Sequence, residues 1–183
     1  MATIKGAGYS RPAKILHWLV ALSVIVIVPV GLLMGRAKGP LADGLYNFHK
    51  SLGALVLILM TLRIIYRFSR GAPASEPTLK PWERMASETV HWSLYVLLIV
   101  TPLVGLFAMS AYGASTPFFG LFEIPPIIAQ NKPLAGRLFY LHGWLGWAVG
   151  VLFCMHIAAA LQHHFIRRDG VMRRMLPKAM GGA

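Results

Sequence analysis

The chain has 183 residues, of which 56% are hydrophobic and only 13% are charged, whereas soluble domains usually carry about 25% charged residues. Its length indicates a single domain over residues 1–183 and leaves no room for a separate nucleotide-binding or catalytic domain. The formal net charge of +12 does not indicate nucleic-acid binding, because the basic residues are divided among the segments between apolar stretches.

Four apolar segments are long enough for a helix to cross a bilayer, which takes about 20 residues. They predict an all-α integral membrane four-helix bundle with spans at about residues 15–35, 48–68, 88–110 and 139–164. The second span is the weakest, since Arg63 and Arg67 lie near its end.

The connections between these spans are polar and rich in Gly and Pro. We expect a short loop at residues 36–47 and a longer basic one at residues 69–87. The segment 111–137 holds several prolines and phenylalanines, and we expect it to lie on the membrane surface with its aromatic rings at the interface.

Lys and Arg residues give the orientation. Thirteen of the 18 flank the start of span one, the connection between spans two and three, and the end of span four. Cytoplasmic segments carry the excess of Lys and Arg, so both termini are predicted to be cytoplasmic. In a bacterium the chain would be a multi-pass protein of the inner membrane, in contact with lipid, and its other face would be periplasmic.

Four of the seven histidines are expected at matching depths in this topology. His49 opens span two and His142 opens span four, so both lie near the outer face. His156 follows His142 by fourteen residues, which is about 21 Å along a helix and about 40° from the same side. It therefore falls in the inner half, as does His17. The predicted pairs are His49 with His142 and His17 with His156.

A neutral imidazole inside a bilayer is costly unless something binds it. Paired histidines on facing helices of a bundle are typical of haem sites, so the two pairs predict two b-type haems with bis-histidine iron. With both axial positions filled, such iron would exchange electrons without binding a substrate. Covalent c-type attachment is excluded, because the chain has one cysteine, Cys154, and no Cys-x-x-Cys-His motif. The alternative is that each histidine only hydrogen-bonds a neighbouring helix.

Three further histidines compete for the inner site. His91 begins span three from the inner side, and it could replace His17 or His156, meet a haem propionate, or contact a quinone. His163 and His164 end span four on the same side and are expected among the lipid headgroups.

Three basic residues are candidates near these sites. Arg63 is the charge most nearly inside the membrane, and it could bind a haem propionate in bidentate fashion or snorkel to the inner surface. Lys50 and Arg137 lie beside the outer pair, where they could meet the other haem's propionates or anchor the chain at the interface.

Several segments resemble the bacterial cytochrome b561 family. They include Ile-Leu-His-Trp-Leu-Val at residues 15–20, Thr-Pro-Leu-Val-Gly-Leu at residues 101–106, Leu-His-Gly at residues 141–143 and His-Ile-Ala-Ala-Ala-Leu-Gln-His-His at residues 156–164. The resemblance covers nearly the whole chain. It implies a four-helix membrane protein with two b haems and the same four axial histidines.

The resemblance also implies electron exchange with the quinone pool, with ubiquinone as an exchangeable carrier. For some relatives it implies oxidation of superoxide at the periplasmic face, and Lys50, Lys132 and Arg137 suit attraction of such an anion. Two other functions stay open at this point. One is a haem b anchor subunit that passes electrons to or from a peripheral dehydrogenase or hydrogenase. The other is a histidine-lined metal or solute transporter, disfavoured because no carboxylate lies deep in a span.

Overall fold

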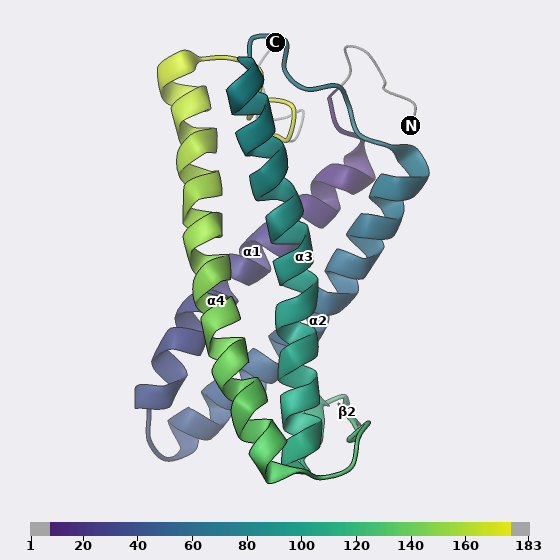
Figure 1. Cartoon of the computed structure of the whole chain (residues 1–183), viewed down its shortest axis with the longest axis vertical. Helices are drawn as coiled ribbons and strands as arrows, with labels where there is room; N and C mark the ends of the chain where they lie inside the picture. Colours follow the sequence, from purple (N-terminus) through teal and green to yellow (C-terminus); the bar gives the residue numbers. More distant parts are fainter. Residues whose placement is uncertain (1–7, 177–183) are drawn as a thin grey trace.

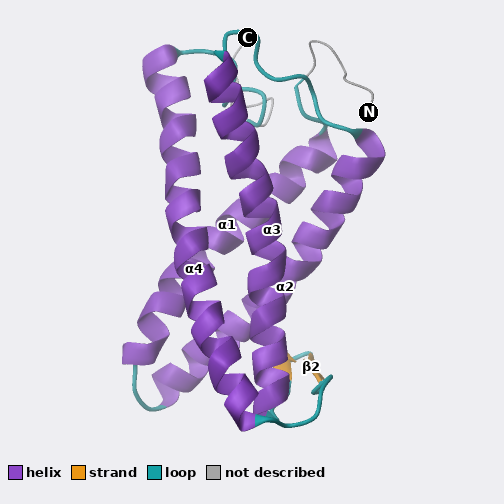
Figure 2. Cartoon of the chain, in the orientation of Figure 1, coloured by secondary structure: helices purple, strands orange, loops and turns teal. Residues whose placement is uncertain are grey.

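A computed structural model describes residues 8–176. Four long helices dominate it (Figures 1 and 2), and a short antiparallel hairpin lies between the last two. The long helices are α1 (Arg11–Leu33), α2 (Pro40–Arg70), α3 (Pro81–Tyr112) and α4 (Lys132–Leu161). The short elements are the 3-10 turn η1 (Met34–Arg36), the strands β1 (Thr116–Phe118) and β2 (Phe122–Ile124), and the π-helical turn η2 (Gln162–Arg167).

All four long helices are long and apolar enough to span a membrane, over Arg11–Arg36, Pro40–Arg70, Pro81–Tyr112 and Lys132–Arg167. The predicted all-α four-helix membrane bundle is therefore confirmed. The helices reach beyond the predicted spans, and much of residues 36–47 and part of residues 69–87 are helical instead of looped. Hydropathy does not detect such polar end turns. Proline at the first helical position, as at Pro40 and Pro81, starts a helix without losing a needed N–H group.

The helices form two crossed pairs, with α3 and α4 in front of α1 and α2 in the view of Figure 1. α1 packs along α2, α3 packs along α4, and α2 also packs on α3. The start of α1 and the segment after α4 meet at one end, where the backbone N–H of Tyr9 donates to the carbonyl oxygen of Arg174 at 3.3 Å. This end carries the Lys and Arg excess, so we assign it to the cytoplasm.

The buried core is small and lies in the middle of the bundle. Its largest cluster takes residues from all four helices: Val20, Val24, Val56, Met60, Leu94, Tyr95, Leu98 and Val149. Many other large apolar side chains face outward, including Ile15, Ile58, Val96 and Val151. This is expected where the surrounding solvent is lipid, as apolar as the side chains themselves.

Hydroxyl groups of two buried serines fix the hairpin segment to the outer end of the bundle. On α2, the Ser51 hydroxyl lies 2.9 Å from the carbonyl oxygen of Pro117 and accepts the backbone N–H of Phe119 at 3.0 Å. On α3, the Ser110 hydroxyl accepts the N–H groups of Ile127 and Ile128. The segment predicted to lie on the membrane surface is thus held against α2 and α3 by specific hydrogen bonds.

The segment after α4 folds back over the cytoplasmic end of α1. The indole N–H of Trp18 donates to the carbonyl oxygen of Met175 at 3.0 Å, and the Lys14 ammonium donates to that of Leu176 at 2.6 Å. His163 lies 2.6 Å from Asp169. Burial alone would raise the pKa of Asp169, but its contact with His163, together with the Val171 N–H and nearby Arg167, holds that pKa below the usual value.

Candidate functional site

The structure brings His49 of α2 and His142 of α4 together at the outer end of the bundle. Their ring centroids lie 5.9 Å apart, and the ring planes are nearly perpendicular at 84°. The sequence predicted this pairing from the depth of each residue. Their role as ligands stays a prediction.

Neighbouring helices fix the orientation of both outer rings. The Nδ1–H of His142 donates to the Thr101 carbonyl oxygen at 2.9 Å, which leaves the lone pair on Nε2 free for a metal. A Cβ atom at Gly105 would lie 3.0 Å from the His142 ring, and one at Gly31 would lie 2.9 Å from Cε1 of His49. Each outer ring therefore rests close to a helix backbone, and an added Cβ at either glycine would require the ring to move.

The inner end holds three histidines instead of two. His17 of α1 and His156 of α4 have ring centroids 6.2 Å apart at 77°. The His91 ring of α3 lies closer to His156, at 5.1 Å, and its Nδ1–H donates to the Ser87 carbonyl oxygen at 2.6 Å. The structure therefore brings His17, His91 and His156 together at the inner end, whereas His163 and His164 lie in η2.

Ring spacing tests whether these pairs fit an iron ion between them. A metal–imidazole bond is about 2 Å long, and a ring nitrogen lies roughly 1 Å from its centroid, so imidazoles on opposite sides of one ion have centroids about 6 Å apart. The separations of 5.9 Å for His49–His142 and 6.2 Å for His17–His156 fit this value. The separation of 5.1 Å for His91–His156 is shorter, which favours His17 as the partner of His156.

Each pair offers two nitrogen ligands. Within residues 8–176, no three or more His, Cys, Asp or Glu side chains are grouped so as to hold a metal ion. Two axial imidazoles are the number that a bis-histidine haem iron takes from its protein, since the porphyrin supplies the other nitrogens.

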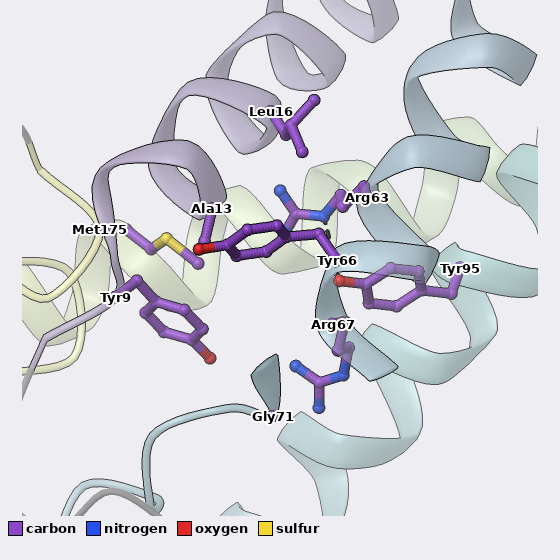
Figure 3. A pocket seen from close by; sticks show the side chains of 9 residues that line it. All are labelled: Tyr9, Ala13, Leu16, Arg63, Tyr66, Arg67, Gly71, Tyr95 and Met175. Carbon is purple, nitrogen blue, oxygen red and sulfur yellow. Dashed lines mark hydrogen bonds between the residues drawn. The ribbon is translucent and has the colours of Figure 1, made fainter. Parts of the chain in front are cut away.

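Two arginines lie one helical turn apart near the cytoplasmic end of α2 (Figure 3). The Nε–H of Arg63 donates to the Tyr95 hydroxyl at 3.1 Å. The guanidinium groups of Arg63 and Arg67 both lie over the Tyr95 ring, at 5.5 and 5.6 Å from its centroid, and Arg67 also lies 5.4 Å from the Trp92 ring. The sequence singled out Arg63 but not Arg67. The signal for Arg67 was its spacing of four residues from Arg63, which places both on one side of a helix.

The remaining candidates lie at the two ends of the bundle. Lys50 directly follows His49 and is half-buried, so its side chain leaves α2 about 100° around the helix from that ring. Lys132 and Arg137 are exposed in the first two turns of α4. His163 and His164 lie in the π-helical turn η2, beyond the end of α4.

Similarity to known proteins extends over nearly the whole chain. A sequence profile described as prokaryotic cytochrome b561 matches residues 8–178. The chain is 35% identical to cytochrome b561 homolog 2 of Escherichia coli strain K12, over 89% of this chain and 88% of that protein. It is 31% identical to the probable superoxide oxidase CybB of Yersinia pestis, over 91% and 94%. It is 28% identical to cytochrome b562 of Cereibacter sphaeroides, over 92% and 95%.

Proposed function

The chain belongs to the prokaryotic cytochrome b561 family, and we propose that it transfers electrons across the bacterial inner membrane between a periplasmic donor and the quinone pool. The family implies bound haem b, which supplies an acceptor and donor of single electrons. The observation that supports the proposal is the presence of two histidine pairs whose ring spacings of 5.9 and 6.2 Å would allow each pair to hold one iron.

The four paired histidines would hold the two haems. His49 and His142 would hold the outer haem, and His17 and His156 the inner haem. The carbonyl of Thr101 fixes the proton of His142 on Nδ1, so that Nε2 can face iron. His91 would stand beside the inner haem, with its own Nδ1 proton fixed by the Ser87 carbonyl.

Basic side chains would bind the propionate groups of the two haems. Arg63 would bind a propionate of the inner haem, because its guanidinium is aimed by Tyr95 and presents further N–H donors. Lys50, half-buried beside His49, would serve a propionate of the outer haem. Ubiquinone would be the exchangeable electron carrier.

Haem content tests the central claim. The purified chain is expected to carry two haem b per polypeptide, because it has two histidine pairs whose ring spacing suits one iron each. The pyridine haemochrome assay against quantitative amino-acid analysis measures this ratio, and reduced-minus-oxidised spectra show whether the haem is redox-active. A colourless preparation, or one that binds one haem at saturation, would contradict the proposal.

We propose superoxide as the donor. A relative that the chain matches over most of its length is named a probable superoxide oxidase, and the outer face carries Lys50, Lys132 and Arg137. Positive charge around a site raises the encounter rate of an anion by about 10-fold or more. Replacing all three by Gln should therefore slow reduction of the oxidised protein by superoxide about tenfold at low ionic strength, as measured by stopped-flow absorbance.

A variant with the same loss of charge at the cytoplasmic end provides the control. Arg70, Arg84 and Arg173 are exposed there, and their replacement by Gln should leave the rate within about twofold. The difference between the two variants should shrink near 1 M salt, where the Debye length falls to about 3 Å. Equal rates for both variants at low salt would refute steering, and no reduction of the unaltered protein would refute superoxide as donor.

A further inference from the structure

The arginines at the cytoplasmic end of α2 present buried N–H donors without acceptors. Within residues 8–176, Nη1 of Arg63 and Nε of Arg67 are buried and have no hydrogen-bond partner. Burying a polar group without a partner costs free energy, and the cost is larger for a charged group. Two such donors one turn apart indicate an anionic ligand that accepts from both.

These arginines line a small pocket that adjoins the inner histidines. α1 contributes Ala13 and Leu16 to its wall, and Leu16 directly precedes His17. Arg63 is close enough to act electrostatically on His17 and His156. The rest of the wall is Tyr9, Tyr66, Gly71, Tyr95 and Met175 (Figure 3).

Tyr95 holds both arginines in place. Its ring lies beneath both guanidinium groups, and its hydroxyl accepts the Nε–H of Arg63. A guanidinium stacked on a ring keeps its N–H groups free at the edges. The edge of Arg63 that remains available carries Nη1, whereas that of Arg67 carries Nε. None of the described residues that line the pocket is acidic, and Arg63 and Arg67 present two fixed donors there.

We propose that Arg67 joins Arg63 in a two-arginine clamp that binds the propionate carboxylates of the inner haem. This assignment rests on the proposed function, because it takes the inner histidines as haem ligands. A carboxylate has two oxygens that accept charge-assisted hydrogen bonds from such forks. A lipid phosphate offers similar acceptors, so the test separates the two sources.

The rate of haem release tests the proposed clamp. Haem transfer from the detergent-purified protein to excess apomyoglobin should show one phase for each haem, and the His142→Ala variant, which keeps the inner site intact, identifies the inner phase. Arg67→Gln should speed that phase on the order of tenfold, the effect of losing one charge-assisted bond. Arg70→Gln, which removes the same charge from an exposed position three residues away, should change it by less than about twofold. Arg67→Lys keeps the positive charge but lacks the forked guanidinium donors, so its rate of inner-haem release should lie between those of Arg67→Gln and Arg70→Gln.

Reconstitution with haem dimethyl ester identifies the ligand. The ester has no free carboxylates, so Arg67→Gln and the unaltered protein should release it at equal rates. An Arg67→Gln effect that persists with the ester would overturn the clamp. So would an effect that appears only in nanodiscs with phosphatidylglycerol, because that would identify a lipid phosphate as the ligand.

The outcomes also separate this proposal from the proposed function. An unaltered chain that binds no haem contradicts both. Two haems per chain, with equal release of ordinary haem from Arg67→Gln and the unaltered protein, contradict the clamp alone.

Discussion

Replacing His142 by alanine is expected to leave a folded chain with one haem instead of two. The substitution removes one of the two imidazoles at the outer site and touches nothing at the inner site. Val149, part of the buried central cluster, lies on α4 halfway between His142 and His156, and each half of that interval is about 10 Å of helix. The haem-to-protein ratio from the pyridine haemochrome assay measures the result, and His17→Ala should give the converse loss of the inner haem.

Helical content by circular dichroism is the control for this pair of variants. Loss of both haems from His142→Ala, with unchanged helical content, would contradict two separate sites.

His91→Ala provides a matched test at the inner end, because the His91 ring lies nearest to that of His156. It should keep both haems, since the 5.1 Å separation is shorter than two ligands of one iron require. Loss of the inner haem from His91→Ala but not from His17→Ala would reassign the ligand.

The pairing of the histidines could be predicted because it depends on quantities that a sequence contains. Apolar run lengths gave the spans, the Lys and Arg distribution gave their direction, and the helical rise gave depth along each span. The fourteen residues between His142 and His156 separate the two rings by about 21 Å along the axis of α4. Depth alone does not choose between His17 and His91 as partner of His156, because the two residues lie at similar depth in their spans.

The parts that sequence reasoning missed depend on contacts between segments far apart in the chain. Nothing near Ser51 in sequence indicates that its hydroxyl accepts the N–H of Phe119. The sequence places Arg67 only near the end of the second span, because hydropathy cannot show that Tyr95 of another helix lies beneath it. The role of Gly31 also comes from another helix, since only the packing of α1 on α2 places it against the His49 ring.

Gly31→Ala is expected to weaken haem binding at the outer site without destabilising the haem-free protein. A Cβ at this position would lie 2.9 Å from Cε1 of His49 and 3.4 Å from its Nδ1. In the haem-free chain the ring can rotate away at little cost, because it is the far end of a flexible side chain. A ring bound to iron cannot move away in this manner. Overpacking of a fixed group typically costs about 1–3 kcal/mol, which corresponds to about 5- to 150-fold faster release of the outer haem.

Gly53→Ala on α2 is the matched control, since its added Cβ would meet only Ile27 Cδ1, at an ordinary contact distance of 3.7 Å. Haem transfer to apomyoglobin should be unchanged in this variant and faster in Gly31→Ala, with only the outer phase affected. Thermal unfolding of the haem-free proteins should give similar midpoints for both, whereas the haem-loaded Gly31→Ala protein should unfold at a lower temperature than the loaded control. If Gly31→Ala lowered the haem-free midpoint by the same amount as the loaded one, the glycine would serve helix packing alone. The His49 ring would then not be held in place by a ligand, and the outer half of the proposed electron path would lose its support.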